Sequence, residues 1–267
     1  MAPTIIPRAA RRLLYKLLQL DYSTGILSLL LLPLIIPEVK SAETVEEMIS
    51  LLYSRRLARL LLAPMQIREE LEALAALVAG ARPSTVLEIG TARGGTLAVW
   101  TRAASSDALI ITIDLPGGPF GGGYGAARIP LYLSLRRGRQ RIVLLRGDSH
   151  SAATITRVKG ILDGRRVEFM FIDGDHSFEG VCRDYNNYKE LLAEKSILAF
   201  HDIVPGPEHM VGGVPVFWRM LKSSLKEPCK TLEIVKDWRQ GGYGIGVILV
   251  REGCRLPRLS CHSPCRG

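Results

Sequence analysis

Six side chains able to bind ligands or move protons follow short apolar runs of the sequence. Each run has the length of a buried strand, and helical patterns lie between the runs. The carboxyl ends of parallel strands meet at one edge of a sheet, where ligands bind. We therefore expect these side chains to line one crevice, because crowded carboxylates need a ligand or a cation to offset their repulsion. They are Glu88, Asp114, Asp148, Asp173, His201 and Asp202.

The segment 86–95, VLEIGTARGG, has the pattern of a strand followed by a glycine turn that opens a helix. Gly90 permits a strained backbone and lets a ligand lie against the turn. The turn differs from the dinucleotide fingerprint Gly-x-Gly-x-x-Gly, since Ala92 stands where the second glycine belongs. The usual cradle for a pyrophosphate is therefore altered, and Glu88 would repel a phosphate but attract an ammonium group.

Strand-end acids indicate which ligand this turn would bind. Asp114 can accept hydrogen bonds from both hydroxyls of a ribose, and Asp148 can accept one from the exocyclic amine of an adenine. An ammonium group, a ribose and an adenine without a phosphate are parts of S-adenosylmethionine. The sequence therefore predicts a site for this cofactor, formed by Glu88, Gly90, Thr91, Gly94, Asp114, Asp148 and Asp173.

The order of apolar runs predicts the fold. Continuous apolar strands that alternate with helices are typical of a parallel sheet covered on both faces. We therefore predict an α/β fold: a Rossmann-like, doubly wound, mostly parallel seven-stranded sheet with an N-terminal helical extension. Strands are expected at 85–89, 109–114, 142–145, 167–172, 197–200, 232–235 and 245–250, with a helix over 178–194 among those between them. The expected domains are 1–66 (helical and apolar), 67–252 (the α/β domain) and 253–267 (a basic tail with cysteines).

The N-terminal segment combines positive charge with an apolar run. Four Lys and Arg residues lie between positions 8 and 16, and the apolar run 26–36 follows them. That run contains Pro33 and is shorter than the roughly 20 residues that span a bilayer. Three roles stay open for it: dimerisation, peripheral contact with a membrane interface, or packing on its own domain. Next, Thr44 and Glu47 form a capping-box pattern, which predicts a helix through Met48, Leu51, Leu52 and Leu60.

The five cysteines are odd in number and lack the spacing of a disulfide framework. Three of them crowd into the last fourteen residues beside His262, in a spacing that matches no familiar zinc site. We therefore expect free thiols in a reducing compartment and a mobile tail. The location this implies is cytoplasmic, with membrane association left open. The cysteines are Cys182, Cys229, Cys254, Cys261 and Cys265.

Overall composition is that of a folded domain with excess positive charge. The chain has 267 residues, of which 47% are hydrophobic and 23% charged, and these values exclude a disordered or fibrous chain. The formal net charge of +9 suits an acidic partner such as nucleic acid or a lipid surface, although many soluble enzymes are equally basic. The segment 117–125, GGPFGGGYG, is either a mobile lid over the site or a flexible surface loop.

Four motifs resemble those of class I methyltransferases, and the resemblance covers the segment from Thr85 to about Val250. The subgroup they resemble includes the cephalosporin-biosynthesis methyltransferase and the rhamnosyl and macrolide-sugar O-methyltransferases. The first motif is common to all class I enzymes, and the third is the most specific. The motifs are LEIGT at 87–91, GDSH at 147–150, FIDGDHSF at 171–178 and FHDI at 200–203.

The resemblance implies a divalent-metal site and a general base. In this subgroup and in catechol-type O-methyltransferases, the acid ending the fourth strand and two adjacent residues ending the fifth hold the metal. The matching residues are Asp173, His201 and Asp202, and His176 matches the base. A metal lowers the pKa of a hydroxyl group, and a histidine can take its proton at neutral pH. Relatives often carry an oxygen ligand in place of His201, so this histidine favours manganese, iron or zinc over magnesium, or the absence of a metal.

The activity implied is S-adenosylmethionine-dependent O-methylation of a sugar or another small molecule, and we expect a homo-oligomer. Two alternatives stay open. A nucleic-acid methyltransferase would suit the charge, but DGDH at 173–176 differs from the Asn/Asp-Pro-Pro-Tyr/Phe motif of amine-methylating enzymes. A non-catalytic, S-adenosylmethionine-binding or membrane-associated scaffold would not need His176 and Asp202, and both are present.

Overall fold

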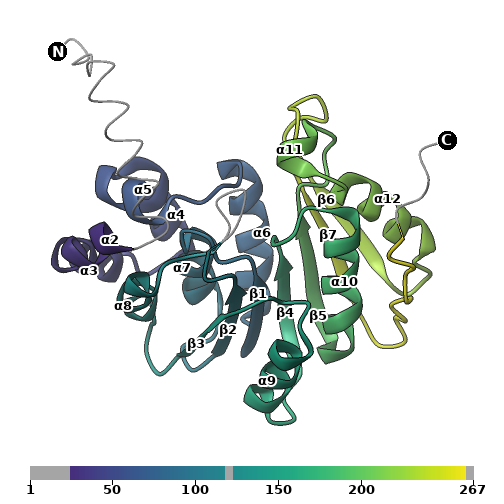
Figure 1. Cartoon of the computed structure of the whole chain (residues 1–267), viewed down its shortest axis with the longest axis horizontal. Helices are drawn as coiled ribbons and strands as arrows, with labels where there is room; N and C mark the ends of the chain where they lie inside the picture. The colour runs from purple at the N-terminus through teal and green to yellow at the C-terminus, as the bar shows by residue number, and fades with distance from the viewer. Residues whose placement is uncertain (1–24, 118–122, 263–267) are drawn as a thin grey trace.

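The computed structural model describes residues 25–117 and 123–262, and Figure 1 shows their arrangement around a central sheet. The seven strands have the order β3-β2-β1-β4-β5-β7-β6. Strands β1 to β5 pair in parallel, whereas β7 is antiparallel to both of its neighbours. The strands are β1 (Thr85–Ile89), β2 (Leu109–Asp114), β3 (Arg141–Arg146), β4 (Val167–Ile172), β5 (Leu192–His201), β6 (Lys230–Ile234) and β7 (Ile245–Val250).

Helices cover both faces of this sheet (Figure 1). Those before β1 are α2 (Ile26–Leu30), α3 (Leu32–Ser41), α4 (Val45–Ser54), α5 (Arg56–Leu62) and α6 (Arg68–Ala81). Those between β1 and β4 are α7 (Gly95–Ala103), α8 (Ile129–Ser134) and α9 (Ala152–Leu162). Those after β4 are α10 (Phe178–Tyr188), α11 (Glu208–Val211) and α12 (Val214–Ser224).

Two hydrophobic layers hold the helices on the sheet. Alternate side chains of a strand point to opposite faces, so Val86 of β1 packs in one layer and Leu87 in the other. The Val86 layer contains the N-terminal helices, α7 and α8, and the Leu87 layer contains α9, α10 and α12. This arrangement confirms the predicted doubly wound, mostly parallel seven-stranded fold with helices before its first strand.

One predicted helix is too long. The helix expected over 178–194 ends at Tyr188, a 3₁₀ turn follows at Lys189–Leu191, and β5 begins at Leu192. Leu192 pairs with Val167 of β4. The boundary is therefore decided by pairing with a neighbouring strand, which a helical pattern in the sequence does not reveal.

The capping box before α4 is formed as predicted. Glu47 N donates to Thr44 Oγ1 at 3.1 Å, and Thr44 N donates to Glu47 Oε2 at 3.2 Å. The helix expected to continue through Leu60 is divided at Arg55, where an extended backbone separates α4 from α5. The local pattern thus predicts where this helical region starts but not its bend.

The N-terminal helices share a core with the sheet. The buried Arg102 of α7 donates from Nη2 to Val39 O at 2.6 Å and from Nε to Ala42 O at 2.9 Å. These bonds satisfy carbonyl groups near the end of α3. None of the helices in the described part of the chain is long and apolar enough to cross a bilayer. The cations at 8–16, residues 118–122 of the glycine-rich segment and Cys265 lie outside the described residues.

The cysteines form bonds that the sequence analysis did not expect. Cys182 of α10 is bonded to Cys261, and Cys229 is bonded to Cys254. The prediction of free thiols is wrong for these four residues, and disulfides are typical of oxidising rather than reducing compartments. The partners lie 79 and 25 residues apart in the chain, so only the folded tail brings them together.

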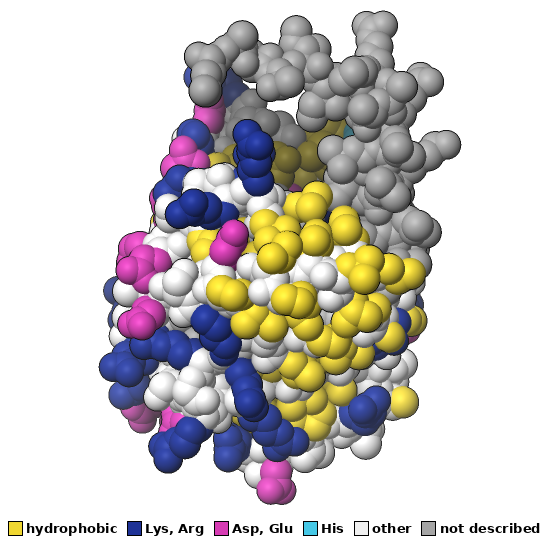
Figure 2. Space-filling view, turned by 90° about the vertical axis from the view of Figure 1, so that its left-hand side faces the viewer, with side chains coloured by type: hydrophobic (Ala, Val, Ile, Leu, Met, Phe, Trp, Pro, Cys, Tyr) yellow, Lys and Arg dark blue, Asp and Glu magenta, His cyan; other side chains and the backbone are white. Residues whose placement is uncertain are grey.

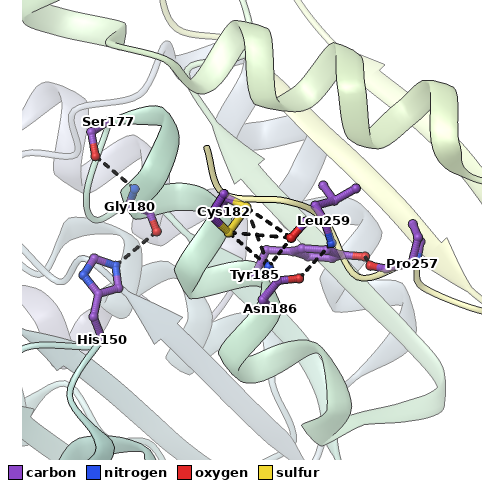
Figure 3. Close-up of a disulfide and its surroundings, with 9 residues drawn as sticks. His150, Ser177, Gly180, Cys182, Tyr185, Asn186, Pro257 and Leu259 are labelled. Carbon is purple, nitrogen blue, oxygen red and sulfur yellow. Dashed lines mark hydrogen bonds between the residues drawn. A yellow bond between two sulfur atoms is a disulfide. The ribbon is translucent and has the colours of Figure 1, made fainter. Parts of the chain in front are cut away.

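The tail packs along α10, in contrast to the mobile tail that we expected. Tyr185 Oη donates to Pro257 O at 2.7 Å. Asn186 bonds Leu259 twice, donating from Nδ2 to the carbonyl at 2.9 Å and accepting from the amide at 3.1 Å. Figure 3 shows these contacts beside the Cys182–Cys261 disulfide. Side chains of α10 thus donate hydrogen bonds to backbone carbonyl groups of the tail, and these bonds hold the segment as far as Cys261 in place.

Replacing Cys182 and Cys261 together by Ser should lower the free energy of unfolding by about 2–4 kcal/mol, because the unfolded chain regains the entropy of a long closed loop. Urea unfolding of the double variant against the wild type measures the loss. Peptide mapping without reductant should recover the Cys182–Cys261 pair. Free thiols at both positions in the native protein would contradict the assignment.

Candidate functional site

A cavity of about 1190 Å³ lies beyond the carboxyl ends of β1 to β5. Two of the connections that start there diverge to opposite faces of the sheet, since the strand order changes direction between β1 and β4. Such a switch point is where open α/β sheets bind ligands. Eight of the predicted site residues line this one cavity: Gly90, Thr91, Asp114, Asp148, Asp173, His176, His201 and Asp202.

The floor of the cavity depends on a close backbone approach at Gly90. Its φ of 95° lies in a region that glycine adopts at little cost. A Cβ at this position would overlap the carbonyl oxygen of Asp173. Gly90 N donates to Ile113 O at 2.9 Å, and Asp173 N donates to Ile89 O at 2.8 Å. The glycine therefore also lets the ends of β1, β2 and β4 meet, a packing role beyond the strained turn and the ligand contact that the sequence predicts.

Asp114 ends β2 beside this turn. Its Oδ2 accepts from Ala92 N at 2.6 Å and its Oδ1 accepts from Leu115 N at 2.7 Å. Burial raises the pKa of the carboxyl, and the backbone donors oppose that shift. The two amides fix the direction of the carboxylate, whose remaining lone pairs can face a ligand in the cavity.

Two residues predicted to bind the cofactor, Glu88 and Gly94, lie outside the cavity lining. Glu88 lies on the same face of β1 as Val86, so it is fully buried and its Oε1 accepts from Trp100 Nε1 of α7 at 2.8 Å. Gly94 precedes α7 with a φ of 79°, and a Cβ there would overlap the ring of Tyr132. Strand alternation thus directs Glu88 toward α7, and ring packing leaves no room for a side chain at position 94.

The carboxyl ends of β4 and β5 hold a cluster of two acids and two histidines. His201 Nδ1 lies 3.1 Å from Asp173 Oδ1 and 3.4 Å from Asp202 Oδ2. His176, in the loop before α10, places Nε2 3.4 Å from Asp173 Oδ1 and Nδ1 3.4 Å from Asp202 Oδ2. β4 and β5 are parallel neighbours, as the predicted meeting of Asp173 and Asp202 requires.

Opposite charges control the protonation of this cluster. Burial acts against the charged forms, but the attraction between the groups is stronger. The pKa of His201 is therefore well above its ordinary value, and the pKa of Asp173 is below its own. For His176, burial is again outweighed by Asp173 and Asp202, which raise the pKa to about 9. Protons on the histidines thus supply the positive charge that the carboxylates need.

The same residues have the chemistry of a divalent-metal site. Asp173, His201 and Asp202 can each offer one ligand atom, and these atoms all lie within 4.8 Å of one another. Two carboxylate oxygens and one imidazole nitrogen suit manganese, iron or zinc. A cation bound there would replace the protons that the histidines carry. The donor set therefore fits the metal that the sequence motifs imply.

His176 is oriented by a backbone carbonyl. Its Nδ1 lies 2.5 Å from Met210 O, and a carbonyl oxygen can only accept a hydrogen bond. The neutral ring therefore keeps its proton on Nδ1 and has its lone pair on Nε2, on the side of Asp173. This is the tautomer that a base at the cavity wall requires.

Two residues that the sequence analysis missed support the cluster, one from the loop before α6 and one from α6 itself. Gln66 Nε2 donates to Asp173 Oδ2 at 2.7 Å. Glu70 of α6 accepts from Lys236 N and Gly244 N, both at 3.0 Å, and so holds the loop between β6 and β7. That loop presents Tyr243, whose amide donates to Asp202 Oδ1 at 3.1 Å. Gln66 and Glu70 carry no motif, because their partners lie more than a hundred residues away.

His150 also lines the cavity and joins it to α10. Its Nε2 lies 3.3 Å from Asp184 Oδ1 and 3.1 Å from Gly180 O (Figure 3 draws the second contact). Its close contact with the fully buried Asp184 raises the pKa of His150 to about 9. Asp148, two residues earlier, is more than half exposed at the cavity rim. The β3 loop is therefore held by a charged contact with the helix that follows His176.

Burial raises the pKa of Glu88 to about 8, so the folded protein binds this proton more tightly than the unfolded chain does. The stability that this proton provides is present at low pH and is lost as pH rises through about 8. Unfolding by urea between about pH 5 and about pH 8.5 should show this loss in the wild type, and Glu88→Gln should flatten it. The exposed Glu194→Gln is the matched control. Equal pH slopes for all three proteins would contradict the assignment.

Comparison with known proteins finds a family model that matches the middle of the chain. Residues 87–203, somewhat under half of the chain, match a family model described as a methyltransferase domain. No curated protein matches the chain in sequence.

Several solved structures share the fold. One is the O-methyltransferase TomG from Streptomyces achromogenes, involved in tomaymycin synthesis and solved with SAM, at 17% identity over 78% of this chain and 89% of that one, with a TM-score of 0.50. Cofactor-bound Rv0187 from MTB has 18% identity over 78% and 88% of the chains, with a TM-score of 0.50. A putative O-methyltransferase from Klebsiella pneumoniae has 16% identity over 87% and 99%, also at 0.50. Residues 87–203 are thus similar to a methyltransferase domain, and the solved structures show that this chain shares their fold.

Proposed function

We propose that the protein methylates a hydroxyl group of a small molecule or glycan, with S-adenosylmethionine as the methyl donor. The observation that carries the proposal is the position of the acid–histidine cluster. Asp173, His176, His201 and Asp202 line the same cavity as the glycine turn at Gly90. An acceptor between the two would have its hydroxyl beside a proton acceptor and a strongly polar wall.

The cofactor would lie along the β1 and β2 side of the cavity. Asp114 would accept hydrogen bonds from the ribose hydroxyls, because the hydrogen bonds from the amides of Ala92 and Leu115 leave lone pairs on its carboxylate for a ligand. Asp148, at the rim of the cavity, would accept a hydrogen bond from the exocyclic amine of the adenine. With Glu88 buried against Trp100, the ammonium group lies nearest to Asp173, whose carboxylate is kept ionised by His201 and His176.

The acceptor hydroxyl would lie against the other wall, among Met65, Met210, Val216 and Tyr243. Its oxygen attacks the methyl carbon, the carbon–sulfur bond breaks, and the electron pair of that bond stays on sulfur. In the form in which its ring is neutral, His176 Nε2 takes the hydroxyl proton, since the carbonyl of Met210 holds the proton of the other ring nitrogen. Asp173, His201 and Asp202 would hold a divalent cation, which supplies a lower pKa to a bound hydroxyl. The apolar lining favours a small molecule with an apolar part over a nucleic acid.

Location and assembly remain predictions. We infer a homo-oligomer on the sequence alone. A cytoplasmic location is weakened by the Cys182–Cys261 and Cys229–Cys254 disulfides, which reducing compartments disfavour.

Replacing Asp114 by Ala should weaken S-adenosylmethionine binding by about 1.5–3 kcal/mol, because hydrogen bonds to a charged acceptor are lost. Isothermal titration calorimetry measures the change. Asp114→Asn, which keeps one oxygen acceptor, should lose less, and Asp107→Ala replaces an exposed aspartate as a control. Unchanged affinity in Asp114→Ala would refute the ribose contact.

Replacing His176 by Ala should lower kcat on the order of 10²–10⁴-fold and leave cofactor affinity unchanged, as the loss of a positioned base does. Labelled S-adenosylmethionine and a panel of sugar and phenol acceptors provide the assay, with the exposed His262→Ala as the control. Chelation should abolish turnover, and manganese or iron should restore it better than magnesium if His201 is a ligand. Full activity after exhaustive chelation would remove the cation from the mechanism and leave His176 alone as the base.

A further inference from the structure

Helices α2 and α3 present an apolar stripe to the outside of the protein. Its side chains recur at the spacing of one helical face. The most exposed are Leu30, at 71%, and Leu34, at 61%. We call this surface the N-terminal stripe and define it by Ile26, Leu29, Leu30, Pro33, Leu34 and Pro37, all of which are exposed.

The rest of the fold holds the stripe in this outward position. On the opposite side of α3, Ile35 and Val39 are fully buried in the hydrophobic core. Leu27, Leu31 and Leu32 pack against the same core. The helices are therefore apolar on both faces, and the outward face is exposed in the described part of the chain. Such a patch marks an interaction surface rather than ordinary surface variation.

Figure 2 views this side of the molecule and shows a continuous apolar area with Lys and Arg side chains below it and to its left. α8 lies beside α2 and α3 and extends the area with the exposed Leu133. Lys40, at the end of α3, donates to the carbonyl oxygen of Arg136, so these two cations lie together. The sequence immediately before the stripe, residues 1–24, carries four Lys or Arg residues and one acid.

We propose that the N-terminal stripe docks on an anionic phospholipid surface, with α2 and α3 lying in the interface rather than crossing it. An apolar helix face bordered by cations gains both from burial among acyl chains and from attraction to acidic headgroups. A second copy of the chain fits less well, because it would bring the same cations and the same net charge of +9 against one another. This inference does not depend on the methyl acceptor.

Co-sedimentation of the full chain with vesicles tests the proposal. The protein should bind vesicles of phosphatidylcholine mixed with phosphatidylglycerol, and much less to phosphatidylcholine alone or at high salt. The double variant Leu30→Glu, Leu34→Glu should bind the anionic vesicles on the order of 10-fold more weakly or worse, since two apolar contacts become repelled charges. Leu232→Glu, an exposed leucine of β6 at 43%, is the matched control and should bind as the wild type does. All three should unfold at the same temperature, because the substituted side chains are exposed.

Three results would overturn the proposal. The first is the absence of binding between the full chain and anionic vesicles. The stripe would then be covered by another part of the chain or left exposed to solvent. The second is equal binding by the wild type and the double variant, or equal binding to neutral and anionic vesicles. The third is a dimer in analytical ultracentrifugation that the double variant disrupts while vesicle binding is absent, which would assign the surface to a second copy.

Discussion

The balance of charge around Asp173 is the interaction on which the rest of the site depends. A buried carboxylate carries a large desolvation cost unless a positive group lies beside it. His201 and His176 meet this need at 3.1 Å and 3.4 Å, and Asp202 shares both imidazoles. Because these residues come from the ends of β4 and β5 and the loop before α10, the balance also fixes the relative positions of three chain segments. A divalent cation would compete with the histidine protons for the same oxygens.

The glycine turn sets the other half of the cavity by a different means. Gly90 has no side chain, so the carbonyl of Asp173 can lie against it, and the strand ends form a closed floor. The N-terminal helices then complete the wall, with Gln66 bonded to Asp173 and Glu70 bonded to the loop that carries Tyr243. A helical extension that looked separate in the sequence therefore contributes to the site itself.

α10 connects this site to the C-terminal tail. Its first turn contacts His150 through Gly180 O, and its next turn carries Cys182, which is bonded to Cys261. Tyr185 and Asn186 hold the tail by hydrogen bonds. α10, which positions one wall of the cavity, is thus held on its outer side by the disulfide-bonded C-terminal tail. If the N-terminal stripe docked on an acidic membrane, α10 and the tail would stay away from the membrane, because the stripe and the tail lie at opposite ends of the view in Figure 1.

The sequence by itself determined where the strands lie along the chain, that most of them pair in parallel, and which residues stand at their ends. It could do so because apolar runs and the glycines that interrupt them are local features. It therefore predicted the meeting of Asp173, His201 and Asp202. Only the tertiary structure decided that Glu88 faces Trp100, that α10 gives way to β5 at Leu192, and that Gln66 reaches Asp173. The same holds for the two disulfides. Each of these depends on contacts between segments far apart in the chain, and no local pattern of residue types encodes which distant group a side chain will meet.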